Sequence, residues 1–260
     1  MFYKDYLKRK WIQFCRYLLQ QKYLPIMNGP LKGYLWTTAS SYEYIMGDYE
    51  NPETQKTFLS WLKFDTVYYD IGANIGYHAL IANTVTNQGK IYAFEPMPHV
   101  RKIFEQHISL NRNKIPINNI ELLPYAVADK EKRIPFSNDK KQSDGNTFIK
   151  ASPVFIHAAN KMMVQCVSID GLVAKGYARP TVIKIDAEGA ELEILQGALH
   201  TLQTCKPHIL LATHDCHLPG VKDKCLRLLR DLGYNVQYTG NYNKHIAGLD
   251  DYIAIYIDQA

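Results

Sequence analysis

A glycine-containing turn, followed by an acid one strand later, is the part of this sequence best suited to hold a small ligand. The run Asp70-Ile71-Gly72-Ala73-Asn74-Ile75-Gly76 follows a predicted strand and opens a predicted helix. Glycine allows a tight turn there, and the start of a helix supplies free N–H donors. Glu95 ends the next predicted strand, where a carboxylate accepts hydrogen bonds from both hydroxyls of a ribose. The pair predicts a nucleoside-binding site.

The spacing of this turn argues against a dinucleotide. A G-x-G-x-x-G fingerprint that starts at Gly72 would need glycine at Asn74 and Tyr77, so a nicotinamide-dependent reductase is disfavoured. Asp70 instead suits a cofactor with a cationic amino-acid end, such as S-adenosylmethionine. The pattern resembles the first motif of class I methyltransferases, with Asn74 at the usual middle glycine. Asn tolerates the left-handed backbone conformation that a glycine would adopt there.

A second group of acids follows the predicted strand 181–187. Asp186 lies where that strand meets its loop, which is the ligand-binding edge of doubly wound sheets. An acid there could contact the cofactor, act as a base, hold a metal or cap the next helix. Glu188 could have a similar role, whereas for Glu191 and Glu193 we favour ordinary first-turn acids that interact with the helix dipole.

Alternating strand and helix patterns position these residues. The predicted strands are 67–71, 91–95, 120–128, 181–187, 208–213, 234–240 and 252–257, and the predicted helices are 76–85, 98–112, 190–202 and 221–233. This order predicts an α/β fold with a mostly parallel, doubly wound Rossmann-like sheet, ending in an antiparallel strand pair at one edge. Residues 137–162 are predicted to form a long loop or lid, in which Ser143, Asp144 and Asn146 could contact substrate.

Charge and composition divide the 260-residue chain into a basic extension and cap at 1–64 and a main domain at 65–260. Residues 1–24 carry the whole net charge of +5, so the neutral body argues against a nucleic-acid partner. A helical spacing of Trp11, Cys15, Leu18 and Leu19 predicts a helix that packs on the body or on a second subunit. The alternative is a helix that lies on an anionic membrane surface.

The apolar content of 47% excludes a disordered chain, and no apolar run reaches the ~18 residues of a membrane span. Five cysteines stand far apart in the sequence, which predicts reduced thiols and a cytoplasmic protein. The basic leader is the segment that could reach the inner face of a membrane.

Residues from about 48 to 215 resemble FkbM-type methyltransferases, a class I S-adenosylmethionine-dependent family with a Rossmann-like fold. The motifs that carry the resemblance are Gly47-Asp48-Tyr49-Glu50, Asp70 to Tyr77, Phe94-Glu95-Pro96, Ala126-Val127-Ala128 and Lys184-Ile185-Asp186-Ala187-Glu188-Gly189-Ala190-Glu191. The resemblance implies methyl transfer to a hydroxyl of a sugar, glycan or natural product. It also implies that Tyr49 and Glu50 close over the methionine end of the cofactor. The family often has Glu-x-His after the fifth strand, where this chain has Ala212-Thr213-His214.

The turn and the resemblance together give a set of expected cofactor contacts. They are Glu50, Asp70, Gly72, Ala73, Asn74, Gly76, Tyr77, Glu95, Pro96, Ala126, Val127 and Asp186. Tyr77 and its neighbour His78 open a helix beside the turn, and core packing is the favoured alternative for both side chains.

An alcohol acceptor must lose its proton as the new bond forms, and the expected catalytic residues are Asp186, Glu188 and His214. A purely structural role for His214 is an equal alternative. No metal ligands are assigned, because the adjacent residues 214–217 lack the usual metal-ligand spacing. A Mg²⁺ ion held by Asp186 that polarises the acceptor oxygen is left open.

Two other functions stay open. The fold could belong to a binding or scaffold protein without turnover, although the acids at 70, 95 and 186 count against this. It could also be an N-methyltransferase of a nucleic acid or another substrate. Enzymes that methylate base amino groups usually carry Asn/Asp-Pro-Pro-Tyr/Phe at the fourth strand, where this chain has Asp186-Ala187-Glu188-Gly189.

Overall fold

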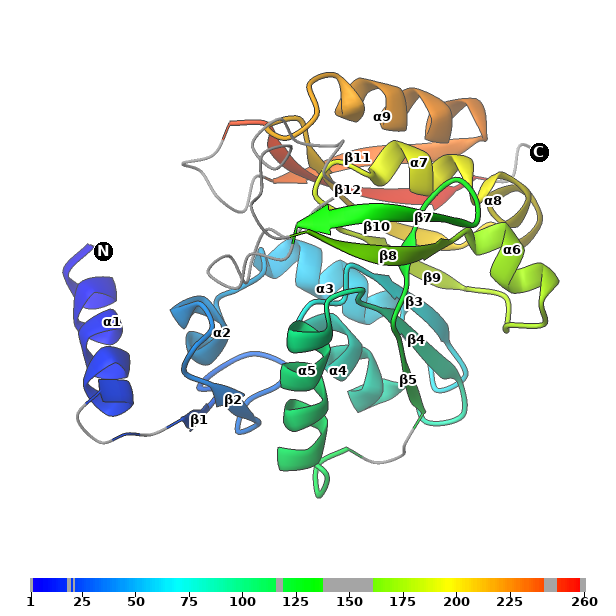
Figure 1. Ribbon diagram of the computed structural model, residues 1–260. Coiled ribbons are helices and arrows are strands. Elements are labelled where there is room, and N and C mark those ends of the chain that lie inside the picture. Colours follow the sequence, from blue (N-terminus) through cyan, green and yellow to red (C-terminus); the bar gives the residue numbers. More distant parts are fainter. Residues whose placement is uncertain are drawn as a thin grey trace.

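A computed structural model describes residues 2–17, 20, 22–115, 119–137, 161–240 and 247–257. Within these residues a seven-stranded sheet forms the centre of the protein (Figure 1). Its strands in spatial order are β11 (Tyr234–Gly240), β12 (Leu249–Tyr256), β10 (His208–His214), β9 (Val182–Ile185), β3 (Val67–Ile71), β4 (Lys90–Phe94) and β5 (Ile120–Leu123). Strand β12 runs antiparallel to both its neighbours, and the other pairings are parallel. The predicted α/β Rossmann-like sheet is therefore confirmed.

Helices cover the sheet. They are α3 (Pro52–Trp61), α4 (Tyr77–Val85), α5 (Pro98–Leu110), α6 (Ile169–Ala174), α7 (Glu191–Gln196), α8 (Leu199–Cys205) and α9 (Val221–Asp231). Helix α4 packs on β3 and β4, whereas α7 and α9 pack on β10 and on each other. The central strands β3, β4 and β9 are largely buried, and Tyr68, Tyr69 and Phe94 are fully buried between the layers.

The segment predicted as one strand at 120–128 is two strands in different sheets. β5 ends at Leu123 and pairs with β4, whereas β6 (Ala126–Val127) pairs with β8 (Lys161–Val167) in a small sheet that β7 (Lys132–Ser137) completes. Pro124 lies between them, and proline cannot donate to a sheet ladder. The predicted helix 190–202 is likewise two helices, with Gly197 between them, and a side chain at Gly197 would collide with the Ala128 carbonyl.

The predicted loop at 137–162 is wrong at both ends, because Ser137 closes β7 and Lys161 and Met162 begin β8. Burial alternates along β8. Val164 and Cys166 are buried, whereas Met163 and Gln165 are exposed. This alternation is the strand signal that the prediction missed. Residues 138–160, with Ser143, Asp144 and Asn146, lie outside the described residues.

The N-terminal segment begins with α1 (Phe2–Tyr17), followed by the antiparallel pair β1 (Tyr23–Pro25) and β2 (Leu35–Thr37) and by α2 (Tyr42–Met46). Helix α1 buries Ile12 and Cys15, whereas Trp11 is 41% exposed, so Trp11 does not pack on the body, and its contact with a second subunit stays a prediction. Leu18 and Leu19 lie outside the described residues. No helix in the described ranges is long and apolar enough to cross a membrane.

The cap is packed on the main sheet domain. The Trp36 ring stacks on His107 of α5 at a centroid distance of 3.8 Å, and the Thr37 N–H donates to His107 Nε2 at 3.1 Å. The boundary between residues 64 and 65 stays a prediction.

The turn after β3 brings two strand ends into close contact. Gly72, Asn74 and Gly76 have φ angles of +74°, +49° and +95°, all in the left-handed region. The N–H groups of Gly72 and Ala73 donate to the Phe94 carbonyl of β4. A Cβ atom on Gly72 would lie 1.9 Å from the Asp186 carbonyl oxygen, so the loop after β9 depends on the missing side chain.

We predict that Gly72→Ala destabilises the protein by about 2 kcal/mol or more, since it adds a backbone collision to the strain of a positive φ. Gly220→Ala is the matched control, because Gly220 has φ +79° but no atom within 4 Å of an added Cβ. Urea unfolding of the two variants measures the difference. Equal losses of unfolding free energy would show that the close contact has no effect.

Candidate active site

A buried lysine joins the ends of β3 and β9. Lys184 is 5% exposed, and its Nζ donates to the Gly72 carbonyl at 3.2 Å. The same ammonium lies 3.2 Å from Asp186 Oδ2 and 3.6 Å from Asp70 Oδ1. Burial lowers the pKa of Lys184, but the carboxylates of Asp186 and Asp70 outweigh it and raise the pKa above its usual value. Lys184 therefore carries its charge inside the protein.

Glu95 is the second acid beside the glycine turn. It is 7% exposed and accepts hydrogen bonds from the N–H groups of Met97 at 2.8 Å and Asn74 at 3.2 Å. Burial raises the pKa of Glu95 to about 7, against the opposing effect of these hydrogen bonds. The carboxyl group next to the turn thus changes its charge near neutral pH.

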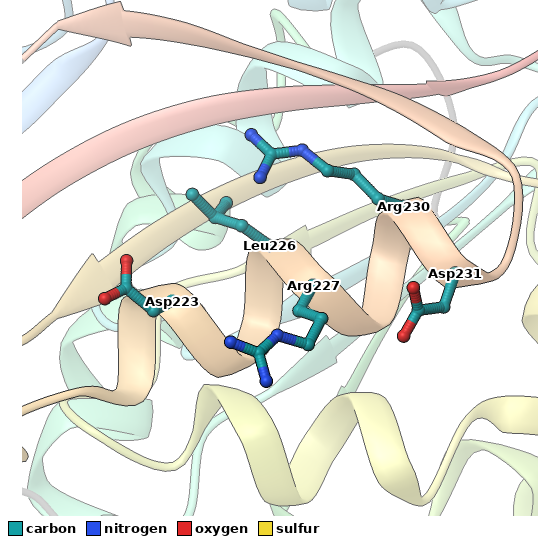
Figure 2. A pocket seen from close by; sticks show the side chains of 5 residues that line it. All are labelled: Asp223, Leu226, Arg227, Arg230 and Asp231. Atoms are coloured by element: carbon teal, nitrogen blue, oxygen red, sulfur yellow. The ribbon is translucent and has the colours of Figure 1, made fainter.

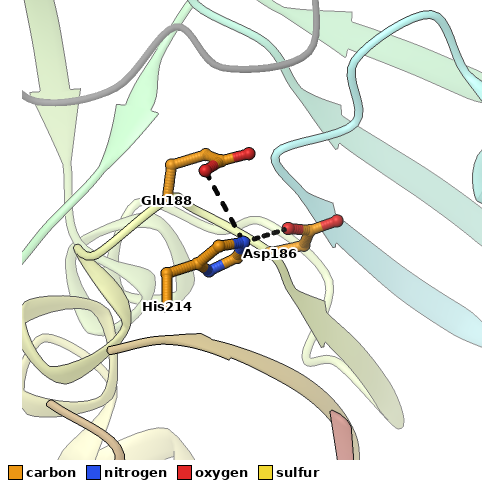
Figure 3. Close-up of side chains that lie close together, drawn as sticks. All are labelled: Asp186, Glu188 and His214. Carbon is orange, nitrogen blue, oxygen red and sulfur yellow. Dashed lines mark ion pairs between the residues drawn. The ribbon is translucent and has the colours of Figure 1, made fainter. Parts of the chain in front are cut away.

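The three expected catalytic residues lie together (Figure 3). Asp186 and Glu188 follow β9, and His214 ends β10. The Nε2 atom of His214 is 3.5 Å from Asp186 Oδ1 and 3.6 Å from Glu188 Oε2. Glu188 has a left-handed φ of +53°, which is uncommon for a residue with a long side chain and suggests a functional position. His217 Nδ1 lies 2.9 Å from the same Glu188 oxygen.

Glu191 holds His214 in place. Glu191 is fully buried, and its Oε1 accepts hydrogen bonds from His214 Nδ1 at 2.8 Å and from the Gly189 N–H at 2.8 Å. The interpretation of Glu191 as an ordinary first-turn acid is therefore incomplete. Glu193 fits that interpretation, since it is half exposed and pairs with Lys132.

The charge on His214 follows from these neighbours. Burial lowers the pKa of His214, but the hydrogen bond to Glu191 and the carboxylates of Glu188 and Asp186 raise it to about 10. These neighbours favour the protonated form of the ring.

Asp251 of β12 also lies in this charged environment, although it was not among the expected residues. Burial, and then the carboxylates of Glu50 and Asp186, raise the pKa of Asp251 to about 8. The predicted strand began at residue 252, whereas β12 begins at Leu249. Asp250 and Asp251 gave no strand signal, because aspartate is depleted in strands, and only the pairing with β10 extends β12 to Leu249.

Other expected cofactor contacts are in the core. Tyr77 is 3% exposed, packs against Trp36, Tyr44 and Tyr49, and accepts a hydrogen bond from Gln55. The side chains of Ala126 and Val127 are buried as well. The role of these three residues in binding stays a prediction.

Glu50, by contrast, contacts the helix that follows the glycine turn. Its Oε2 lies 3.0 Å from Nε2 of His78, the second residue of α4. The pair is nearly buried, so the segment before α3 is attached to the start of the helix that follows the turn.

A hollow on helix α9 is separate from this arrangement (Figure 2). It is lined by Asp223, Leu226, Arg227, Arg230 and Asp231, all from one helix, and by none of the residues above. The described candidate site is therefore the charged edge where β3, β4, β9 and β10 end.

Comparison with known proteins shows the family to which the chain belongs. Residues 70–236 match the family model described as the methyltransferase FkbM domain. The chain is 32% identical over 147 residues to the hexuronic acid methyltransferase AglP of Haloferax volcanii. This alignment covers 54% of this chain and 53% of the relative. It is 22% identical over 193 residues to the methyltransferase sdnD of Sordaria araneosa, in an alignment that covers 64% of this chain and 73% of the relative.

Solved structures share the fold. The crystal structure of methyltransferase FkbM from Methylobacillus flagellatus KT aligns with a TM-score of 0.54 and 17% identity, over 82% of this chain and 50% of that chain. An rRNA methylase from Streptococcus thermophilus aligns with a TM-score of 0.50 and 12% identity, over 80% and 96%. The chain spans about half the length of AglP and of the FkbM structure. The family match covers more than half of the chain, which therefore belongs to the FkbM methyltransferase domain family.

Proposed function

We propose that this protein transfers a methyl group from S-adenosylmethionine to a hydroxyl of a sugar or sugar-like acceptor. The observation that carries the proposal is the pair of buried carboxylates, Asp70 and Glu95, on either side of the glycine turn. A sugar acceptor is supported by the relative named a hexuronic acid methyltransferase.

The cofactor end of the site is built around Asp70. Its carboxylate is fully buried, and neither oxygen has a hydrogen-bond partner. The Lys184 ammonium lies 3.6 Å from Oδ1, but a buried carboxylate without hydrogen bonds still favours a ligand that brings donors or positive charge, as the ammonium and sulfonium of S-adenosylmethionine do. In this proposal Glu95, at the end of the next strand of the sheet, accepts hydrogen bonds from the ribose hydroxyls.

The acceptor end is the cluster of Asp186, Glu188 and His214. In the transfer, the acceptor oxygen forms a bond to the methyl carbon while the sulfur takes the electron pair of the breaking bond. S-adenosylhomocysteine leaves, and the hydroxyl proton passes to this cluster. Because the donor is already activated, the protein mainly has to align the two substrates and exclude water.

The first prediction separates the two ends. Glu95→Gln should weaken binding of S-adenosylhomocysteine at least tenfold, by loss of charged hydrogen bonds to the ribose. Glu188→Gln should leave that binding nearly unchanged but slow methyl transfer to a hexuronic acid glycoside about a hundredfold or more. Glu193→Gln, an exposed acid on the same helix-starting segment, is the control for both measurements.

Calorimetry measures the binding of S-adenosylhomocysteine, and mass spectrometry of the methylated product measures the transfer. Absence of binding to the wild type would remove the cofactor assignment. Binding without transfer to any of a panel of sugar hydroxyls would favour the scaffold function, and transfer to an amine would favour the N-methyltransferase.

A second prediction concerns pH. Glu95 must be ionised to accept both ribose hydroxyls, and burial raises its pKa to about 7. The affinity for S-adenosylhomocysteine should therefore rise as the pH increases through 7, by up to about tenfold per unit below the pKa. Glu95→Gln should bind more weakly and without this slope. Calorimetry between pH 6 and 8 is the test, and a flat wild-type profile would contradict it.

The same group affects stability with a defined sign. The unfolded chain loses this proton near pH 4.5, whereas the folded chain keeps it until about pH 7. The contribution of Glu95 to the free energy of unfolding therefore falls as the pH rises from 4.5 to 7 and stays constant above that.

We also propose that α1 contacts an anionic membrane surface. Tyr6, Leu7, Trp11, Phe14 and Tyr17 form an exposed apolar stripe on this helix, in the segment that carries the net positive charge. Such a helix binds at the headgroup boundary through apolar burial and attraction to anionic lipid.

The double variant Trp11→Ser/Phe14→Ser should lose co-sedimentation with phosphatidylglycerol vesicles while cofactor affinity is kept. Phe64→Ser, an exposed aromatic outside the leader, is the control. Unchanged vesicle binding would contradict the proposal, and a change in oligomeric state would indicate that the stripe contacts a second copy.

A further inference from the structure

The cluster at the end of β9 and β10 has the arrangement of a metal site. Asp186, Glu188 and His214 each offer one ligand atom, and these three atoms all lie within 4.8 Å of one another (Figure 3). Asp186 and Glu188 follow β9, whereas His214 is the last residue of β10, so their convergence is a property of the sheet edge and is not visible in the local sequence 214–217.

The orientation of His214 supports the same conclusion. Its Nδ1 forms a hydrogen bond with the buried carboxylate of Glu191, and its Nε2 is directed at Asp186 and Glu188. Metal-binding histidines usually have their other ring nitrogen bonded to a carboxylate in this way. The Nε2 to oxygen distances of 3.5 and 3.6 Å are too long for good hydrogen bonds. They are close to the roughly 3.0–3.4 Å between ligands that surround a cation at about 2.1 Å.

The local charge also favours a cation. Four carboxylates, those of Asp70, Asp186, Glu188 and Glu191, lie around one ammonium, that of Lys184, and the His214 ring. Lys184 occupies Oδ2 of Asp186, so Oδ1 is the oxygen that faces the cluster. Even with the His217 ring beside Glu188, the carboxylates outnumber the positive groups in this partly buried region, and a divalent cation would balance the excess.

We propose that Asp186, Glu188 and His214 bind a divalent transition-metal cation. One imidazole nitrogen with two carboxylate oxygens suits Mn²⁺ and its neighbours better than Mg²⁺, which prefers oxygen ligands alone. Three protein ligands leave coordination positions open. If the proposed function holds, an acceptor hydroxyl bound there would be acidified by the cation, which acts as a Lewis acid.

The test uses the full chain, treated with chelator and then titrated with Mn²⁺, with free Mn²⁺ followed by electron paramagnetic resonance. We expect one saturable site that Zn²⁺ displaces and that binds Mg²⁺ more weakly than Mn²⁺. Glu188→Gln and His214→Gln should each weaken Mn²⁺ binding at least about tenfold. Asp223→Asn, an exposed acid on α9, should leave it unchanged.

Circular dichroism identifies a His214 variant that fails to fold. In that case Glu188→Gln decides, because Glu188 is partly exposed and the change conserves its volume. A folded wild type without saturable binding of Mn²⁺ or Zn²⁺ would overturn the proposal, and so would a preference for Mg²⁺. S-adenosylhomocysteine binding is measured on the same samples, so loss of the metal site and loss of the proposed cofactor are distinguished.

Discussion

Lys184 places a positive charge in the interior of the sheet, and the surrounding structure is arranged to compensate for it. The ammonium contacts the Gly72 carbonyl and the carboxylates of Asp70 and Asp186. In the parallel register of β3 and β9, Lys184 is the direct partner of Asp70. A buried ion is tolerated only when it is paired and hydrogen-bonded, and breaking such a pair typically costs about 3–5 kcal/mol. The two strand ends are therefore held together by charge as well as by sheet hydrogen bonds.

The two halves of the proposed site share this lysine. Asp70 and the glycine turn lie on one side of it, and Asp186 lies on the other with Glu188 and His214. If the proposed function holds, a change in charge at the cofactor end would act on the acceptor end through the Lys184 ammonium. The arrangement suits a reaction in which a cationic donor becomes neutral as the methyl group leaves it.

Much of this geometry was predictable from sequence. Apolar runs alternating with helical stretches predicted a mostly parallel sheet, and parallel strands place their carboxyl ends at one edge, so Asp70, Glu95, Asp186 and His214 were expected at the same edge. The left-handed conformation at Asn74 was also consistent with the residue type. Local pattern was less informative for the helix face of α1, where Ile12 rather than Trp11 is buried.

The remaining features depend on non-local contacts. Glu191 looks like any first-turn acid until β10 brings His214 against it, and Asp251 enters the site only because β12 inserts beside β10. Lys184 is a different case, since a charged residue inside the run Val182–Ile185 was a visible sign of a buried ion pair. Its partners could be named only after the register of β3 and β9 was known.

The position of β12 has a consequence for biosynthesis. β12 follows β11 in the chain but lies between β11 and β10, so β11 cannot join the sheet until β12 has left the ribosome. Before then the parallel strands β3 to β10 can assemble with one side of β10 unpaired, and an unpaired apolar edge strand is prone to pair with other chains. Arrival of β12 closes that edge and in the same step delivers Asp251 to the charged cluster. Pairing of β12 thus covers the open edge of β10 and completes the charged cluster together.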